Sequence, residues 1–518
     1  MIRIDGNSLT LEEIHLVANE NLSVSLAHGA VKKIEKSRSW VENIISQGEP
    51  VYGINTGFGV FANRQISREE TKQLNRNLIL SHAVGTGAAL PTEVVRAAML
   101  IRVNTLSKGF SGVRLKLIET LLEMLNKGIH PVIPSQGSLG SSGDLAPLSH
   151  LALVISTDEN DHEGESGAAE YQGVLSSGKK AMEQAGISRI ILEAKEGIAL
   201  NNGATFSAAI AALCCYEANI QLGIADIALA LSLESLRGIS SAFDPRIHQS
   251  RQHPGQIAVA QKILQLIAGS TLIDSTDRVQ DAYSLRCGPQ VQGPAWETLQ
   301  FTEQVVIREI NAATDNPLIF GEGEAISGGN FHGEPIGMVM DFLGIALTEI
   351  AGISERRIYR LTDGKLNEDL PSMLVDNHEA AGLNSGMMMP QYTAASLVLE
   401  NRSLASPDSI YSLPTSAAQE DHNANSMTAA RHTRSIIENT WHVLAIELYT
   451  AARAVDIRRK ENPNAALGVG TDAAYQAIRN VVAYQPGDAL WGPEIDMVKH
   501  IVKNGHLSTQ VKNTLSIH

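Results

Sequence analysis

The sequence is poor in aromatic residues, in cysteine and in clustered positive charge. Phe, Trp and Tyr make up only 4% of the 518 residues, whereas Ala, Leu and Ile are plentiful, a balance that favours close-packed helices over β-sheet. The three cysteines, Cys214, Cys215 and Cys287, show neither metal-ligand spacing nor a disulfide framework, which indicates a reducing compartment. The net charge is −15 and no block rich in Lys and Arg occurs, so we expect no surface for nucleic acid or anionic membranes.

Targeting segments and long uncharged apolar runs are also missing. The stretch from Met1 to Asn21 lacks the basic start and apolar core of a signal peptide. The longest charge-free apolar stretch, near Ala204 to Tyr216, is too short to span a bilayer. We therefore expect a cytoplasmic protein that is not inserted in a membrane. No metal site is expected from the spacing of its His, Cys, Asp and Glu residues.

Helical periodicity dominates the middle and the second half of the chain. Pro335 opens a stretch in which apolar residues recur every three or four positions, which predicts a long buried helix. These residues are Met340, Leu343, Leu347, Ile350 and Ile353. The stretch from Thr92 to Leu106 predicts another helix, and the one from Phe206 to Leu236 is apolar nearly all round, as in a helix surrounded by helices. Strand signals are few and short, such as Arg189 to Leu192, so the sequence predicts a mainly α fold with a long central bundle.

One loop contains small residues in an order that would allow the backbone itself to form an electrophilic group. Residues 137–145 read Gly-Ser-Leu-Gly-Ser-Ser-Gly-Asp-Leu. If the turn presses the amide nitrogen of Gly143 onto the carbonyl carbon of Ser141, a five-membered ring can close. Loss of two waters, one of them from the Ser142 side chain, then leaves an electrophilic methylidene. Glycine is needed third because no side chain obstructs the bent backbone. The alternative interpretation is an ordinary turn and helix N-cap before Leu145.

Other polar clusters interrupt apolar helices, and they are informative because buried polar groups cost free energy unless they are paired. Tyr52 lies in a loop with three glycines, residues 51–59, that could close over a site. A phosphate-binding loop is not favoured there, because no Lys-Ser/Thr pair follows. His82 after Ser81 is, taken alone, more often a core or surface group than a ligand. Arg286 is suited to bidentate capture of a carboxylate, although a structural salt bridge is the commoner use.

Seven separated motifs together resemble the ammonia-lyase and aminomutase family that builds a 4-methylideneimidazole-5-one group from its own backbone. In chain order they are Tyr-Gly-Ile-Asn-Thr-Gly-Phe-Gly (52–59), Gly-Ser-Leu-Gly-Ser-Ser-Gly-Asp-Leu-Ala-Pro-Leu (137–148), Asn-Gly (202–203), Gln-Asp-Ala-Tyr-Ser-Leu-Arg-Cys (280–287), Asp-Asn-Pro-Leu (315–318), Ser-Gly-Gly-Asn-Phe-His (327–332) and Gln-Glu-Asp-His (419–422). The histidine-specific members are the most similar. The resemblance implies an ammonia-lyase/fumarase-like fold and a homotetramer whose active sites draw residues from more than one chain.

The domain organisation that we expect combines these two lines of argument. Residues 1–200 would form a smaller mixed N-terminal part that carries the active-site loops and the Ser-Ser-Gly triad. Residues 201–518 would form the long central bundle and a C-terminal helical part.

The resemblance also implies roles for individual residues. Ser141, Ser142 and Gly143 would form the electrophile, with Ser142 providing the methylidene. Tyr52 would take the β-proton of the substrate, which requires that its surroundings depress a phenol pKa that is ordinarily near 10. Arg286 would clamp the substrate carboxylate.

Three further residues would support the electrophile. Tyr283 and Asn202 would hold the electrophile or the amine in place, Asn202 by polarising the ring carbonyl, and Phe331 would pack near the ring. Covalent capture of the amine makes ammonia a better leaving group. Neither a metal nor a diffusible cofactor would be required.

The substrate is predicted from two separate positions. Ser81-His82 resembles the pair in histidine-specific members, and Glu420 after Gln419 resembles the carboxylate that receives the imidazole N–H in those enzymes. We therefore expect elimination of ammonia from L-histidine to give trans-urocanate. The expected substrate-binding residues are Ser81, His82, Asn202, Arg286, Gln290, Met388, Gln419 and Glu420.

Some positions depart from the family pattern and leave alternatives open. Ser141 replaces a more usual Ala, and the run from Met387 to Tyr392 replaces a more usual Phe-Met-Ile-Ala-Gln-Val. An ammonia-lyase for tyrosine or phenylalanine, or a 2,3-aminomutase, is the main alternative. A non-catalytic scaffold whose triad never cyclises is a third, motivated only by Ser141.

Overall fold

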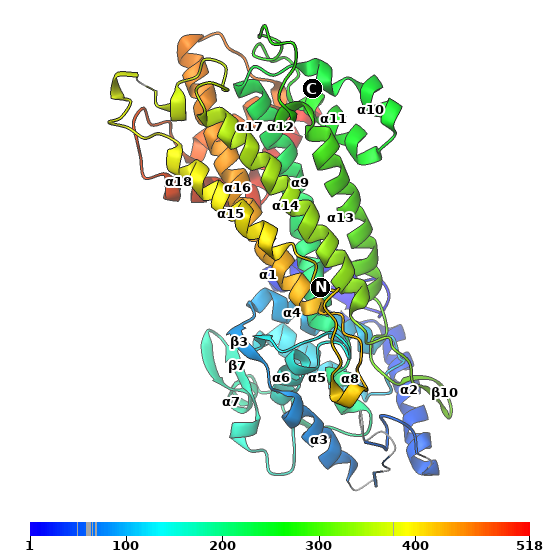
Figure 1. Ribbon diagram of the computed structural model, residues 1–518. Coiled ribbons are helices and arrows are strands. Elements are labelled where there is room, and N and C mark those ends of the chain that lie inside the picture. Colours follow the sequence, from blue (N-terminus) through cyan, green and yellow to red (C-terminus); the bar gives the residue numbers. More distant parts are fainter. Residues whose placement is uncertain (49, 58–63, 65, 68–69, 377, 518) are drawn as a thin grey trace. The chain divides into compact units, whose positions relative to one another are not determined.

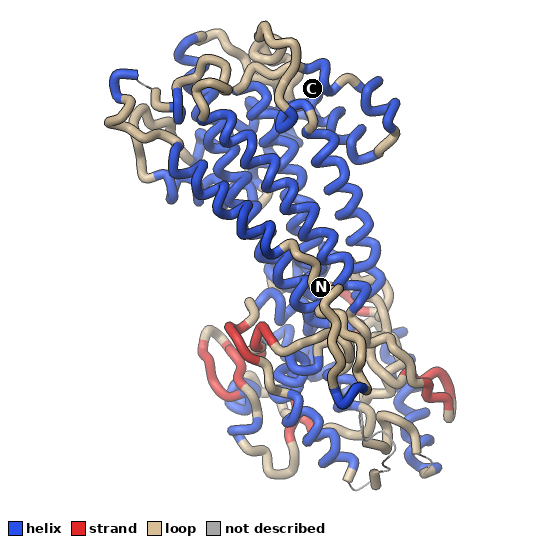
Figure 2. Tube along the Cα trace, in the orientation of Figure 1, coloured by secondary structure: helices blue, strands red, loops and turns tan. Residues whose placement is uncertain are grey.

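The protein is mainly helical, which confirms the fold class predicted from the sequence (Figures 1 and 2). The computed structural model describes residues 1–48, 50–57, 64, 66–67, 70–376 and 378–517. Phe58 and Gly59 of the predicted Tyr52 loop lie outside the described residues.

The chain divides into two compact units, each built from three segments. The first consists of residues 1–216, 302–341 and 407–431, and the second of residues 217–301, 342–406 and 432–518. The sequence predicted a single division after residue 200. Four of the five observed divisions fall inside the long helices α9, α13, α14 and α16, where no break in periodicity marks them, and the fifth, after residue 406, follows the end of α15.

The first unit contains helices and, within the described part of the chain, every strand. Its helices are α1 (Leu11–Glu20), α2 (His28–Gln47), α3 (Thr71–His82), α4 (Thr92–Ser107), α5 (Leu115–Lys127), α6 (Leu145–Ile155), α7 (Gly178–Gln184) and α8 (Glu196–Asn201). The strands are two to four residues long: β1 (Ile2–Ile4), β2 (Val24–Leu26), β3 (Thr86–Ala89), β4 (Ile129–Pro131), β5 (Pro134–Gln136), β6 (Ser156–Thr157), β7 (Ala168–Tyr171), β8 (Val174–Ser177), β9 (Ile190–Ile191), β10 (Leu318–Gly321) and β11 (Glu324–Ile326).

These strands form small separate sheets rather than one layer. β1 pairs with β2 and β6 with β9 in parallel, whereas β3–β5, β10–β11 and the three-stranded β4–β7–β8 sheet are antiparallel. The predicted strand at 189–192 is therefore present as the short β9. The core of the first unit depends instead on helices such as α4, which is buried from Val94 to Ser107.

The second unit is formed by helices and their connections in its described residues. Four long helices have parts in both units: α9 (Thr205–Ser235), α13 (Gly288–Ile310), α14 (Glu334–Thr362) and α16 (Ser426–Glu461). The others in the second unit are α10 (Pro245–Arg251), α11 (Pro254–Leu266), α12 (Tyr283–Arg286), α15 (Met388–Leu404), α17 (Val469–Val481), α18 (Trp491–Lys503) and α19 (His506–Ile517).

Inside the second unit, the segments of α9, α14 and α16 lie side by side (Figure 1). A fully buried ion pair joins Arg357 of α14 to Glu447 of α16, and Ser232 of α9 donates a 2.7 Å hydrogen bond to the same carboxylate. Pairing and hydrogen bonding are what make a buried charge tolerable. The long buried helix predicted from Pro335 onward is α14, so this prediction is confirmed.

Two helices, α9 and α14, are long and apolar enough to cross a membrane by length and composition. This differs from the sequence expectation, which considered only charge-free stretches. However, 72% and 67% of their apolar windows are buried inside the protein, and the buried core helices of soluble proteins pass the same test. Their apolar character is accounted for by packing against other helices.

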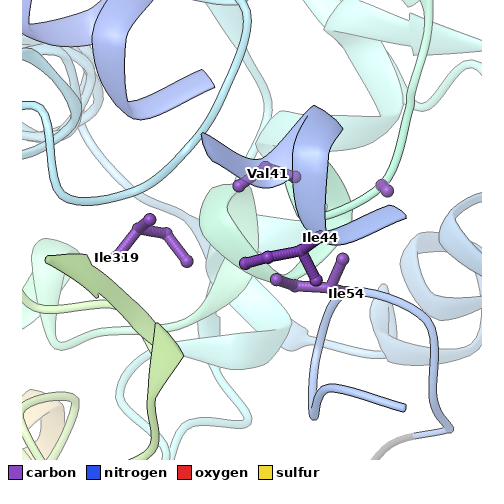
Figure 3. Close-up of a cluster of buried hydrophobic side chains, with 5 residues drawn as sticks. Val41, Ile44, Ile54 and Ile319 are labelled. Atoms are coloured by element: carbon purple, nitrogen blue, oxygen red, sulfur yellow. The ribbon is translucent and has the colours of Figure 1, made fainter. Parts of the chain in front are cut away.

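A hydrophobic cluster in the first unit fixes the segment that carries Tyr52. Ile54 packs with Val41 and Ile44 of α2 and with Ile319 of β10 (Figure 3). Next to it, Gly53 has a φ of +71°, and an added Cβ would lie 2.6 Å from Cδ of Pro317. Glycine is thus required for this close approach. Tyr52 directly precedes this glycine, so the packing of Ile54 holds the backbone that carries Tyr52.

Candidate active site

The Ser-Ser-Gly triad lies at the start of α6 and contacts the connection between α8 and α9. Gly143 has a φ of +77°, and a Cβ built on it would lie 2.0 Å from the carbonyl carbon of Gly203. No L side chain fits there, because Cβ atoms essentially never approach another heavy atom so closely. The third position of the triad therefore requires glycine, as the sequence argument predicted.

Two donors converge on the carbonyl oxygen of Ser142. Asn202 Nδ2 donates to it at 2.8 Å and the Gly203 N–H at 3.1 Å. In the other direction, the Asp144 N–H donates to the Gly203 carbonyl at 2.9 Å. The two segments form an isolated bridge between Gly143 and Gly203, which holds the triad in a bent conformation.

Asp144 explains part of this arrangement in a way that the sequence did not predict. It is the N-cap residue of α6, but its carboxylate caps α9 instead, accepting hydrogen bonds from the Ser207 N–H at 2.8 Å and from Ser207 Oγ at 2.9 Å. Burial raises the pKa of this carboxyl, whereas the hydrogen bonds from Ser207 and Ser138 oppose that effect. The starts of α6 and α9 thus meet beside the triad, and their positive ends favour negative charge there.

The first unit contains a cavity of about 1000 Å³ that is lined in part by Ser141 and Ser142 of the triad. Nine of the residues predicted for the site line it: Tyr52, Ser81, His82, Ser141, Ser142, Asn202, Phe331, Gln419 and Glu420. They come from segments that are far apart in the sequence. The structure therefore gathers residues of six of the seven sequence motifs around one cavity, all except the motif at 280–287.

Glu420 contacts the triad directly. Its Oε2 accepts a 2.7 Å hydrogen bond from Ser141 Oγ, and its Oε1 accepts a 3.0 Å hydrogen bond from Ser142 Oγ. His82, on the last turn of α3, is close enough for its charge to interact with Glu420. Burial lowers the pKa of His82 and the Glu420 carboxylate opposes this effect, so burial favours the neutral imidazole.

The backbone before Glu420 has an unusual conformation. Ser416, Ala417 and Ala418 have φ values of +51°, +52° and +64°. L-residues in this left-handed region cost roughly 1–2 kcal/mol each. Thr415 and Glu420 close the turn through an antiparallel bridge with N···O distances of 2.8 and 3.3 Å.

The cavity also has lining residues that the sequence argument missed. Arg64, Asn77, Asn316, His332, Asp421 and His422 are among them. Asn77 precedes Ser81 by one turn of α3, so helical spacing could have identified it. The aromatic rings of His332 and His422 stack, with 5.8 Å between their centroids, and His332 Nε2 lies 3.2 Å from the His422 carbonyl oxygen.

Four predicted site residues belong to the second unit and do not line this cavity as described. Tyr283 and Arg286 form the short helix α12, in which the guanidinium lies 4.7 Å from the ring centroid of Tyr283. Tyr283 is 72% exposed, and Arg286 Nε donates a 2.9 Å hydrogen bond to the carbonyl of Asp281. Gln290 is on α13 and Met388 on α15.

Metal ligands are not grouped in the described part of the chain. Among those residues, no set of three or more His, Cys, Asp or Glu side chains is arranged to hold a metal ion. The polar groups that line the cavity include those of the triad, the carboxylate of Glu420, the hydroxyls and the imidazoles described above.

Comparison with known proteins gives matches along nearly the whole chain. The family model described as "Aromatic amino acid lyase" matches residues 9–480. A histidine ammonia-lyase of Alkaliphilus metalliredigens is 48% identical over 519 residues, which cover 100% of this chain and 99% of that protein.

Solved structures with the same fold include both lyases and mutases. The histidine ammonia-lyase of Trypanosoma cruzi has a TM-score of 0.90 at 36% identity, covering 99% of this chain and 95% of that one. The tyrosine aminomutase of Streptomyces globisporus has a TM-score of 0.91 at 34% identity, covering 99% and 98%. The fold by itself thus does not separate elimination from amine migration.

Proposed function

Because the chain belongs to the aromatic amino acid lyase family, we propose that it eliminates ammonia from L-histidine to give trans-urocanate. The observation that carries this proposal is that Glu420, Ser81 and His82 line the same cavity as Ser142. A carboxylate beside the triad can accept the imidazole N–H of a histidine side chain. The similarity to histidine ammonia-lyases over the full chain supports the same substrate.

The triad fits the 4-methylideneimidazole-5-one group. The Gly143 position excludes any side chain, and the two donors from Asn202 and Gly203 meet the Ser142 carbonyl that would become the ring carbonyl. When formed from Ser141, Ser142 and Gly143, the group supplies an electrophile that makes the substrate amine a better leaving group. The proposed reaction requires no metal and no diffusible cofactor.

The surrounding residues would bind and deprotonate the substrate. Tyr52 would take the β-proton, and its anchored backbone would hold the phenol at a fixed place in the cavity. Phe331 and Gln419 would pack beside the ring and the substrate. Glu420 would orient the imidazole, which fixes the β-carbon relative to Tyr52.

The residues of α12, α13 and α15 enter this proposal through oligomerisation. We expect a homotetramer in which an active site draws residues from more than one chain. In that assembly Arg286 would clamp the substrate carboxylate, Tyr283 would help to hold the amine, and Gln290 and Met388 would line the pocket. The exposed ring of Tyr283 is available for such a contact. We place the enzyme in the cytoplasm, with no membrane or nucleic-acid partner.

The proposal is tested by a side-by-side assay with L-histidine, L-tyrosine and L-phenylalanine. Urocanate formation that is lost in Ser142→Ala supports both the substrate and the electrophile. Intact mass provides an independent readout, since the matured chain must be lighter by two waters and the Ser142→Ala chain must not lose the water from residue 142. An unmodified mass of the wild-type chain would refute the proposal and leave the non-catalytic scaffold.

A second candidate function is an aromatic ammonia-lyase or a 2,3-aminomutase. It is favoured by the similarity to the tyrosine aminomutase and by Tyr392 and the Met387–Met389 run, which depart from the family pattern. Chiral analysis of the products distinguishes it. A β-amino acid, or faster turnover of tyrosine or phenylalanine than of histidine, would replace the first proposal.

A further inference from the structure

The side chain of Ser141 has no part in the proposed reaction, but it has a well-defined partner. Ser141 is buried, and its hydroxyl donates to Glu420 Oε2 at 2.7 Å, the shorter of the two hydrogen bonds that the carboxylate receives from the triad. Hydrogen bonds with an ionised acceptor are about twice as strong as neutral ones. A methyl group at position 141 could not make this contact.

The two hydroxyls have different fates when the ring forms. The new bond joins the Gly143 nitrogen to the Ser141 carbonyl carbon. The first water takes the Ser141 carbonyl oxygen with one hydrogen from each of the Gly143 and Ser142 amides. The second takes the Ser142 hydroxyl together with the Ser142 α-hydrogen. Neither water contains Ser141 Oγ, so Glu420 loses the donor at Oε1 and keeps the donor at Oε2.

The two ends of the remaining hydrogen bond are fixed by separate contacts. The Gly333 N–H donates to the carbonyl of Gly140 at 2.8 Å, which holds the backbone just before Ser141. On the other side, the Thr415–Glu420 bridge closes the left-handed turn that precedes the carboxylate. A left-handed stretch of L-residues persists only where the surrounding structure determines it. The position of Glu420 is therefore not free to adjust.

From this geometry we propose that Ser141 is a positioning residue for substrate recognition. Its hydroxyl holds one oxygen of Glu420 after Ser142 has lost its own hydroxyl, so that the other oxygen is available to the imidazole N–H of the substrate. The inference rests on the proposed function and deepens it, because it assigns a role to a side chain in which this chain departs from the usual Ala.

The test measures binding of a substrate analogue that cannot react. The probe is 3-(imidazol-4-yl)propanoate, titrated by calorimetry into wild type, Ser141→Ala, Ser141→Thr, Glu420→Ala and the Ser141→Ala/Glu420→Ala double variant. Intact mass reports ring formation in each protein. We expect Ser141→Ala to lose two waters as the wild type does and to bind the analogue about tenfold more weakly, the loss expected for one hydrogen bond to a charged group. Ser141→Thr should bind as the wild type does.

The double variant separates positioning from general structural damage. If Ser141 acts through Glu420, Ser141→Ala should have no further effect on binding once the carboxylate is removed. An unchanged affinity of Ser141→Ala, or an equal loss in both backgrounds, would overturn the inference while leaving the proposed function intact. A wild-type protein that neither binds the imidazole analogue nor forms urocanate would instead refute the proposed function, and the inference with it.

Discussion

A buried carboxyl group in the second unit predicts how stability depends on pH. Glu234, near the end of α9, has no exposed surface, and its Oε1 accepts a 2.7 Å hydrogen bond from the N–H of Gly468, the N-cap of α17. Burial raises the pKa of Glu234 from an ordinary value of 4.5 to about 7, although the hydrogen bond from Gly468 opposes it. The folded protein thus holds a proton that the unfolded chain would release.

The sign and the size of the effect follow from this difference. Below pH 4.5 the group is protonated in both states and contributes nothing to pH dependence. As the pH rises from there to about 7, the unfolded chain loses the proton first, so the free energy of unfolding falls. A pKa difference of roughly 2.5 corresponds to about 3 kcal/mol, lost in full above the folded pKa. Glu234→Gln cannot ionise and should escape that loss.

Guanidinium unfolding of the two proteins at a series of pH values measures this directly. The advantage of Glu234→Gln over wild type should grow with pH through the interval between the two pKa values and level off above it. Glu349→Gln, at an exposed position on α14, is the matched control and should follow the wild type. Parallel curves for wild type and Glu234→Gln would refute the reasoning.

Three further predictions concern the first unit. Asn202→Ala removes a donor to the triad carbonyl and should lower kcat by about 10²–10³, measured as urocanate formation; a smaller loss than tenfold would contradict that role. In Gly143→Ala the new Cβ would clash with Gly203, so the chain should retain both waters by intact mass; loss of both would show that the loop can adjust. Lys195→Met leaves the buried carboxylate of Asp315 without its ion-pair partner and should lower the free energy of unfolding by about 3–5 kcal/mol. The double variant Lys195→Met/Asp315→Leu should recover most of this loss, and a Lys195→Met variant as stable as wild type would contradict the pairing argument.

Helices were the predictable part of the fold because their signal is local. The stretches expected from Thr92 to Leu106 and from Phe206 to Leu236 agree with α4 and α9 to within one residue at each end. The strands of the β4–β7–β8 sheet were not predicted, since each is only three or four residues long and their partners lie up to about 40 residues away. The division into two units was also hidden, because four of its five boundaries interrupt helices whose periodicity continues unchanged.

The site shows a similar limit. Motif residues such as Tyr52, Asn202 and Glu420 could be named from the sequence, and the structure places them around one cavity. The sequence could not show that Asp144 caps α9 rather than its own helix, because that choice depends on where residue 207 lies in space. It also gave no sign of the hydrogen bond between Ser141 and Glu420, whose residues are 279 positions apart.

The left-handed turn at Ser416–Ala418 has a consequence for how this cavity can change during evolution. A glycine at any of these positions would relieve conformational energy, but it would also let the loop sample other paths. Without glycine, the turn is conformationally less favourable, but its backbone has fewer alternative conformations. New substrate preferences are therefore more accessible through exchange of side chains such as Ser141 or His82 than through movement of the backbone that carries Glu420.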